Sequence, residues 1–379
     1  IDVLTESNME RHIYRYFRFF YLSGLILLFA TSCSADAGEP SEPETPTTPT
    51  DEYTYLNVEY RKWQNGTFQL WTTADSRETR IIDNMNWYAP SGDYTRTAWG
   101  GRNGLQPSSV TGKEGFFRVA HCGGRAYLLD PDNGAVILHG VQHVRPGEST
   151  AHQKAFSTKY GSESRWSEET GKLLADNHIN YISYGSNRIE VFPAAVRGNL
   201  LTPKTQKIAY AENLYLLRTF MWDMSKNLGY AFDDDKYNRL VLLFEPTFAT
   251  YIDRLVQEKS ALFAGDRHFI GFYLDNELPF ASYQGTGYAN TEGGGWLVHT
   301  QKNRGEFYQN FCLRLLETRN CVGWVHFEYN DGYDSNGKAS NKGVVSIEYE
   351  PYESFLSQMR QLNLSVHSLI DYYDIKSVQ

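Results

Sequence analysis

From residue 135 to the end of the chain, short hydrophobic runs alternate with longer helix-like segments. The run from Ala135 to Val141 is almost continuously apolar, which is typical of a strand buried on both faces of a sheet. Strands are predicted at 135–141, 178–184, 214–222, 240–244, 269–274 and 322–327, and helices at about 150–175, 246–261, 301–318 and 350–372. This alternation predicts an α/β fold with a parallel sheet, whose closed form is a (β/α)8 barrel of the TIM type.

The region before this one has the pattern of short strands separated by turns. Between residues 53 and 112, strand-like runs lie at 53–58, 67–71 and 80–82, with Asn-Gly, Pro and Gly-Gly between them. A hairpin follows, in which 116–119 and 125–129 flank a Cys-Gly-Gly turn. Residues 53–112 are therefore a β-rich N-terminal module or an extension that packs on the main domain, and periodicity leaves both interpretations open.

The start of the chain has the features of an export signal. After Met9, three arginines precede a hydrophobic run at 19–30. A bilayer span takes about 20 residues, so this run is too short to cross a membrane and has the length of a signal peptide's hydrophobic region. The segment Ala30-Thr31-Ser32-Cys33 resembles a bacterial lipobox. Residues 1–33 are therefore predicted to be a lipoprotein signal with Cys33 as lipid anchor, and an ordinary secretory signal is the alternative.

Residues 34–52 are rich in Pro, Thr, Ser and Glu and contain nothing to bury, which predicts an extended linker. A lipid anchor, a linker and a folded body at 113–379 predict an exported bacterial lipoprotein. Its expected location is the outer membrane, the cell surface or the periplasm, with the membrane contacted through the N-terminal lipid.

The net charge and the aromatic content of the chain indicate which classes of binding partner to expect. The formal net charge of the chain is −9, whereas nucleic-acid-binding proteins usually present a basic surface, so no nucleic-acid partner is expected. Aromatic residues make up 15% of the chain, and flat rings stack on sugars, although a buried core uses such rings too. The four Cys exclude a disulfide scaffold, and the ten His show no metal-ligand spacing, so no metal and no cofactor are predicted.

The sharpest motif is a polar cluster at the end of the predicted strand 269–274. Asp275, Asn276 and Glu277 follow that run directly, and a barrel carries its active site at the carboxyl ends of its strands. A Glu beside apolar rings suits a general acid, and an Asn beside it can donate a hydrogen bond to a sugar hydroxyl. The alternative is that Asp275 and Asn276 only cap the next helix.

Several segments along the body of the chain occur in a distinctive order. They are FRV (117–119), GRAYLLDPD (124–132), GVQHVRPG (140–147), GFYLDNE (271–277), TQKNRG (300–305), GWVHFEYND (323–331) and SNKGVV (340–345). In this order they resemble the β-agarase-type glycoside hydrolases of family 50, which are clan A barrels.

The resemblance implies a retaining hydrolase of galactans such as agarose or porphyran. Glu277 falls on the acid/base residue of the family, with Asp275 and Asn276 beside it as substrate-binding residues. Lining of the sugar cleft is implied for His143, Trp324, Tyr329 and Asp331.

The sequence departs from the family at the second catalytic carboxyl group. A retaining mechanism needs two carboxyl groups about 5–5.5 Å apart, and the family's nucleophile is a Glu in a segment like P-x-x-x-T-E-F, which this chain lacks. The stretch between Glu277 and Gln301 is too short for the missing βα units. The barrel is therefore predicted to be incomplete, with an internal deletion after Phe280 that truncates it between about 280 and 300. Glu328 is the best remaining candidate for the nucleophile, although the family usually carries a basic residue there.

The sequence supports two functions. The first is a glycoside hydrolase whose partner is an agar-type polysaccharide or oligosaccharide. The second is a catalytically inactive surface lipoprotein that binds the same galactan through aromatic residues. The missing nucleophile segment bears on the first function and not on the second, because cleavage needs a second carboxyl group and sugar binding does not.

Overall fold

The computed structural model describes residues 53–64, 67–86, 88–90, 94–186, 189, 192–228, 244–275, 296–332 and 341–376. The chain divides into two compact units, 1–50 and 51–379, and every described residue belongs to the second. The predicted signal segment, with Cys33, and the predicted linker therefore lie outside the described residues. Within the described ranges, no helix is both long enough and apolar enough to cross a bilayer.

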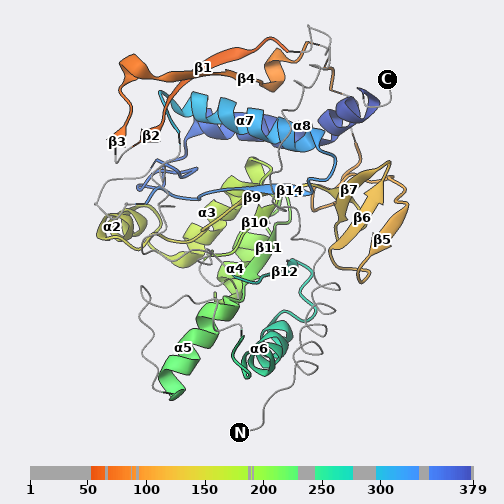
Figure 1. The fold of residues 1–379 in the computed structure, drawn as a ribbon, viewed down its shortest axis with the longest axis vertical. Coiled ribbons are helices and arrows are strands. Elements are labelled where there is room, and N and C mark those ends of the chain that lie inside the picture. The colour runs from red at the N-terminus through yellow and green to blue at the C-terminus, as the bar shows by residue number, and fades with distance from the viewer. Residues whose placement is uncertain are drawn as a thin grey trace, which may run out of the picture. The chain divides into compact units, whose positions relative to one another are not determined.

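A parallel sheet of five strands forms the centre of the second unit (Figure 1). In pairing order the strands are β12 (Phe269–Tyr273), β11 (Ala209–Asn213), β10 (Tyr181–Ile182), β9 (Leu138–Val141) and β14 (Gly323–His326). The predicted α/β class with a parallel sheet is confirmed. Strands β12 and β14 are edges, so the described strands form an open sheet, and no closed barrel is detected among them.

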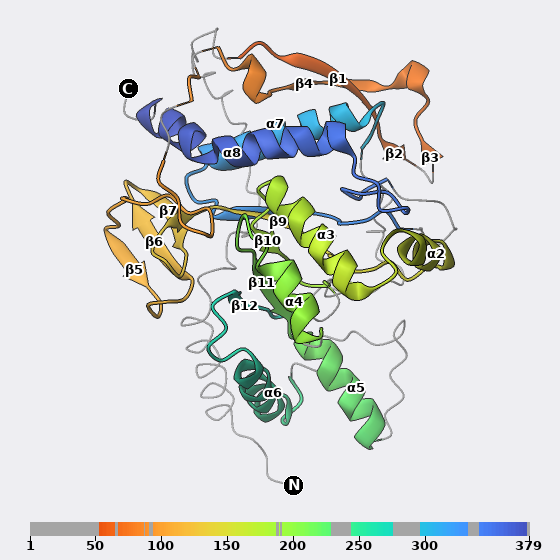
Figure 2. The ribbon, with the colours of Figure 1, turned by 180° about the vertical axis from the view of Figure 1, so that it is seen from behind.

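One face of this sheet is buried under helices. They are α3 (Glu163–Asp176), α4 (Ala194–Leu201), α7 (Gln301–Glu317) and α8 (Glu353–Lys376). Val141, Ile182 and Tyr210 face this layer from three neighbouring strands and are fully buried in its core. Figures 1 and 2 show α7 and α8 side by side along the β14 end of the sheet. Because helices cover these strands, their sequences are continuous hydrophobic runs.

An antiparallel sheet packs against the other face, at the amino ends of the strands. Its strands are β5 (Ser109–Thr111), β6 (Arg118–Cys122), β7 (Arg125–Leu129) and β8 (Ala135–Val136). Leu128 and Val136 of this sheet join Trp99 in a core with Leu138 and Tyr181 of the central sheet. The predicted hairpin is therefore confirmed as β6 and β7, whereas the run predicted as one strand at 135–141 is divided between two sheets.

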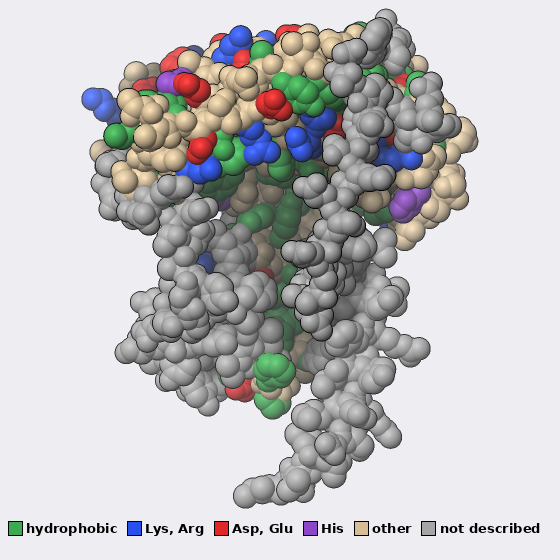
Figure 3. Space-filling view, turned by 45° about the horizontal axis from the view of Figure 1, so that its top comes forward, with side chains coloured by type: hydrophobic (Ala, Val, Ile, Leu, Met, Phe, Trp, Pro, Cys, Tyr) green, Lys and Arg blue, Asp and Glu red, His purple; other side chains and the backbone are tan. Residues whose placement is uncertain are grey.

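A third sheet lies over α7. It consists of β13 (Leu297–Val298), β1 (Leu56–Arg61) and β4 (Asp75–Thr79), with a hairpin of β2 (Trp63–Gln64) and β3 (Thr67–Phe68) and single 3-10 turns at Trp71–Thr73 and Ile82–Asn84. The backbone N–H of Ile82 donates to Gln309 of α7 over 2.9 Å, and Arg80 pairs with Glu317 of the same helix. Figure 3 shows charged side chains dispersed over the outer surface of this layer and hydrophobic side chains gathered below it.

The predicted helix at 150–175 is two helices, α2 (Thr150–Lys159) and α3. Gly161 separates them with φ +68°, a conformation that favours glycine, and its N–H donates to the carbonyl of Phe156 over 3.1 Å. Ser162 then caps α3 by accepting a hydrogen bond from the N–H of Arg165. The chain therefore turns between two helices where the hydrophobic pattern alone showed only one.

The strand predicted at 214–222 is wrong, because the structure has α5 (Leu216–Leu228) there. Leu217, Phe220 and Met221 repeat at helical spacing and are buried together, while Trp222 is 55% exposed. They pack against α6 (Phe248–Leu262), which matches the helix predicted at 246–261. The strand that precedes α5 is β11, which the sequence analysis did not predict.

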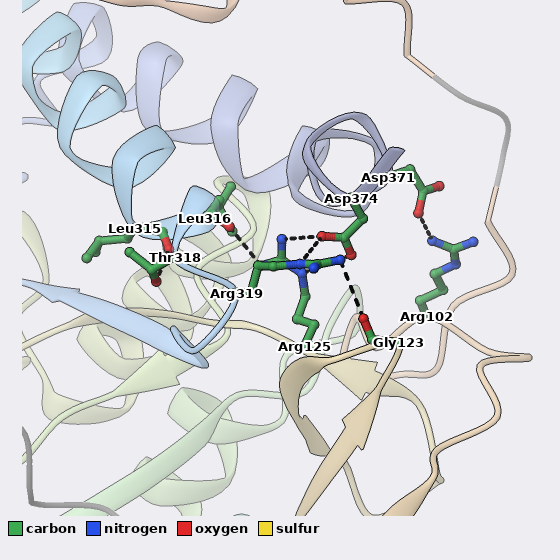
Figure 4. Close-up of polar contacts among 9 residues, drawn as sticks. All are labelled: Arg102, Gly123, Arg125, Leu315, Leu316, Thr318, Arg319, Asp371 and Asp374. Atoms are coloured by element: carbon green, nitrogen blue, oxygen red, sulfur yellow. Dashed lines mark hydrogen bonds and ion pairs between the residues drawn. The ribbon is translucent and has the colours of Figure 1, made fainter. Parts of the chain in front are cut away.

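A buried guanidinium joins three elements at one end of the molecule (Figure 4). The side chain of Arg125 in β7 is 0% exposed, and it donates to Asp374 of α8 over 2.7 and 3.1 Å. Its third contact is the carbonyl of Leu316 in α7 at 2.7 Å. Arg319 donates to the same Asp374 over 3.0 Å. This network connects the antiparallel sheet to both long helices.

We expect Asp374→Ala to lower the free energy of unfolding by about 3–5 kcal/mol, because it leaves the buried charge of Arg125 without its carboxylate partner. The control is Glu169→Ala, which breaks the exposed pair between Arg165 and Glu169 and is expected to cost about 0.3–0.5 kcal/mol. Urea unfolding of the variants measures both values. Equal losses would contradict the assignment of Arg125 as a buried structural charge.

Candidate active site

The carboxyl ends of the five parallel strands lie along one edge of the central sheet, which we call the carboxyl edge. Three of the predicted site residues lie on it: His143 follows β9, Asp275 follows β12, and Glu328 follows β14. Open α/β sheets bind their ligands outside the carboxyl ends of the strands. The carboxyl edge is therefore the candidate active site.

His143 and Glu328 meet between the ends of β9 and β14. The Nδ1 atom of His143 lies 2.9 Å from Oε2 of Glu328, and the two side chains are 24% and 16% exposed. Because a carboxylate only accepts hydrogen bonds, Nδ1 is the donor. The ring of Phe327, which is 44% exposed, contacts the imidazole edge-on at 5.0 Å between centroids. This pair therefore lies within reach of a solute at the carboxyl edge.

Tyrosines gather at the ends of β10 and β12. The hydroxyls of Tyr181 and Tyr273 are 3.2 Å apart, and the rings of Tyr184 and Tyr273 are 4.5 Å apart. Burial, with the Tyr273 hydroxyl as the next cause, raises the pKa of Tyr181 well above its usual value. Burial also raises the pKa of Tyr215, which follows β11, and Tyr184 adds to that shift. The phenols of Tyr181 and Tyr215 therefore stay protonated at neutral pH and are able to donate hydrogen bonds.

Asp275 caps a helix. Its Oδ2 accepts a hydrogen bond over 2.9 Å from the N–H of Leu217 in the first turn of α5. The helix that it caps precedes it in the chain, whereas the sequence alternative named the next one. Asn276 and Glu277 lie outside the described residues, as does the predicted deletion after Phe280.

Two residues of β11 were missed because that strand was not predicted. Glu212 is buried, and its Oε1 accepts from the N–H of Ile189 over 3.0 Å. Asn213 accepts from the N–H of Tyr215 over 2.8 Å, while its buried side-chain N–H2 group has no hydrogen-bond partner. The apolar run before Leu214 was the available signal, since it ends in the polar residues Glu212 and Asn213, as the segment at 271–277 also ends in polar residues.

Three of the residues predicted to line the cleft are buried in the structure. Trp324 is 7% exposed, and its indole N–H donates to Tyr308 of α7 over 2.6 Å. Successive residues of a strand face opposite sides of the sheet, and Trp324 faces the helices. Tyr329 is also buried, with its hydroxyl 2.9 Å from that of Thr170 in α3. Burial raises the pKa of Tyr329 well above its usual value.

The third of these residues, Asp331, organises the loop after β14. Its Oδ1 accepts from the N–H of Gly343 over 2.7 Å, and its Oδ2 accepts from the hydroxyl of Tyr352 over 2.6 Å. Asp331 is 5% exposed. Trp324, Tyr329 and Asp331 are thus buried and hydrogen-bonded within the fold, and their lining of a sugar cleft stays a prediction.

Burial lowers the pKa of two basic groups behind the carboxyl edge. Burial, with Arg304 as the second cause, lowers the pKa of His326 to about 4, so that this imidazole is neutral at pH 7. Burial also lowers the pKa of Arg304 to about 10. Arg304 donates to the carbonyls of Lys342 and Gly343 over 2.9 Å each, which fixes the loop that Asp331 also holds. Within the described ranges, no three His, Cys, Asp or Glu side chains cluster closely enough to hold a metal ion.

Comparison with solved structures finds the same fold in BpGH50. The TM-score is 0.68 at 17% sequence identity, and the match covers 86% of this chain and 98% of that one. The agarase AgWH50C has a TM-score of 0.45 at 12% identity, covering 73% of this chain and 66% of that one. An exo-β-agarase has a TM-score of 0.40 at 12% identity, covering 74% and 69%. No protein-family model and no curated protein sequence matches the chain.

We expect Asp275→Ala to destabilise the protein by about 1 kcal/mol, because the N–H of Leu217 loses its acceptor at the positive end of α5. Asp275→Asn keeps an acceptor oxygen and is expected to lose only a few tenths of a kcal/mol. Chemical unfolding of the pair measures the difference. An Asn variant as unstable as the Ala variant would contradict the capping role.

Proposed function

We propose that this chain is a glycoside hydrolase that cleaves an agar-type galactan by a retaining mechanism, with Glu277 as acid/base and Glu328 as nucleophile. The observation that carries the proposal is the fold match to BpGH50 over 98% of that chain. The name of that protein refers to the hydrolase family that the motif order of this sequence resembles. Support from the carboxyl edge is the partly exposed pair of His143 and Glu328.

The proposed reaction has two displacements. A lone pair of a Glu328 carboxylate oxygen attacks C1 of the galactosyl unit, the C1–O bond breaks, and the leaving oxygen takes the proton of the Glu277 carboxylic acid. A water molecule then gives a proton to Glu277 and attacks C1, which releases the Glu328 carboxylate. The sum of both steps adds one water across the glycosidic bond.

The order of the strands sets a condition on this mechanism. Strands β12 and β14 are the two edges of the sheet, and four strand spacings amount to about 19 Å in a flat sheet. A nucleophile and an acid/base must instead lie about 5–5.5 Å apart. The two carboxyl groups therefore meet only if the sheet curves, as a barrel does, so that its two outer strands, β12 and β14, face each other.

This condition favours a second candidate, a protein that binds a galactan without cleaving it. It needs no second carboxyl group, and the exposed ring of Phe327 and the tyrosines at the ends of β10 and β12 offer contacts for sugar rings. The two candidates differ in turnover, so a single set of proteins separates them.

We expect the folded body, residues 52–379, to release reducing ends from agarose, porphyran or both, and Glu277→Gln to reduce that release by at least about 10³-fold, because the leaving oxygen then lacks its acid. A reducing-end assay measures the rates, and calorimetry with agaro-oligosaccharides measures affinity in the same variant. Activity that survives Glu277→Gln would refute its role. Affinity without turnover in the unaltered protein would establish the binding candidate instead.

The anomer released first reports the distance between the two carboxyl groups. Proton NMR of an early time point is expected to show the anomeric configuration of the cleaved bond retained, because the nucleophile and the acid/base are then about 5–5.5 Å apart. Inversion would indicate a separation of about 6.5–9.5 Å and a carboxylate that activates water. That outcome would contradict Glu328 as nucleophile while leaving the hydrolase proposal in place.

A further inference from the structure

Glu328 is fixed through one of its two carboxylate oxygens. Oε2 accepts the hydrogen bond from His143 at 2.9 Å, whereas no donor among the described residues bonds to Oε1. The side chain is 16% exposed. A carboxylate whose rotation is restrained at one oxygen presents the other oxygen in a defined direction, which is what a displacement at a sugar carbon requires.

The backbone on both sides of this contact is also fixed. On the β9 side, the N–H of Gln142 donates to the carbonyl of His326 over 3.0 Å, and the N–H of Val144 donates to the hydroxyl of Ser186 over 3.0 Å. On the β14 side, the N–H of Tyr329 donates to the carbonyl of Gln142 over 2.9 Å. These hydrogen bonds are made by the neighbours of His143 and Glu328, so the backbone next to both residues is held in position.

His143 has an uncommon backbone conformation, with φ 55°, which among residues other than Gly is found mainly in Asn, Asp and His. This conformation turns its imidazole onto Gly185, in the loop after β10. A Cβ atom at Gly185 would lie 2.3 Å from Cδ2 and 2.6 Å from Nε2 of His143. Gly185 is therefore the surface on which the ring rests, and no larger residue fits there while the ring keeps its place.

We propose that His143 is a positioning residue, which holds Glu328 through its Nδ1–H, and that Gly185 provides the space in which its ring is held. The inference rests on the proposed function, in which Glu328 attacks the sugar. The hydrogen bond requires an acceptor at position 328, because a basic residue there would repel the Nδ1–H group of His143.

Two substitutions of His143 separate positioning from folding. In His143→Asn, the side-chain N–H2 group lies near the position of Nδ1, and Asn tolerates positive φ, so a donor to Glu328 is kept. His143→Leu has a similar size and no donor. We expect His143→Leu to lower kcat about 10²-fold with KM changed less than about twofold, because the nucleophile is misplaced. We expect His143→Asn to recover at least about tenfold of that loss.

A matched pair of glycine variants tests the place of the ring. Gly185→Ala puts a methyl group into the imidazole, whereas Gly161→Ala has the same positive φ, 68° against 77°, and meets nothing nearer than 3.8 Å. Both variants carry the backbone cost, which melting temperatures measure. Only Gly185→Ala is expected to lower kcat, and equal kcat values in the two would overturn the role of Gly185.

A measurement without substrate keeps this inference separate from the proposed function. Nitrogen–proton correlation NMR of the imidazoles reports which ring nitrogen bears the proton, and the His143→Asn spectrum identifies the signals of His143. We expect the Nδ1–H form in the unaltered protein and its loss in Glu328→Ala. If Glu328→Ala leaves that form unchanged, or if His143→Leu keeps full kcat, positioning by His143 is refuted. If the NMR result holds but no galactan is cleaved, the proposed function fails and the contact between the two residues remains established.

Discussion

The buried guanidinium of Arg125 is the contact on which the arrangement of the main layers depends. A charge with no exposed surface is costly unless every donor is matched, and here β7 supplies the cation while α7 and α8 supply the acceptors. With both helices tied to the antiparallel sheet, their apolar sides are held against β9 and β14. The helix layer in turn keeps the parallel strands dry on that side, which a sheet of this kind requires.

That layering determines what the carboxyl edge offers. On each strand, the residues that face the helices become core, and only those at the strand ends or on the opposite side remain available for chemistry. Trp324 and Tyr329 belong to the first class, whereas His143 and Glu328 belong to the second. The edge therefore combines one histidine–carboxylate contact with a group of tyrosines, on strands that the helix layer holds in place.

Much of the fold could be predicted from the sequence, because the apolar run 269–274 is too short for a helix and ends in polar residues, whereas the amphipathic run 301–318 has the length of a helix. The segment after Leu214 could not, since a short apolar run reads as strand or helix until its buried side is known. At the site, motif order located the strand ends correctly, but it could not tell which way Trp324 points or that Asp331 holds a loop. Those outcomes depend on packing between segments far apart in the sequence. The contact between His143 and Glu328 is likewise invisible to local patterns, because 185 positions separate the two residues.

The hydroxyls of Tyr53 and Tyr373 lie 2.9 Å apart, which joins the first described residue to the last helix. This contact and the ion pair of Arg125 with Asp374 both require α8, so the native packing of the N-terminal strands forms only after α8 is present. During synthesis, the N-terminal strands leave the ribosome long before α8 has been made. These strands therefore lack their packing partners for most of translation. The unfinished chain exposes unpaired strand edges during that interval, and such edges make folding intermediates prone to aggregation.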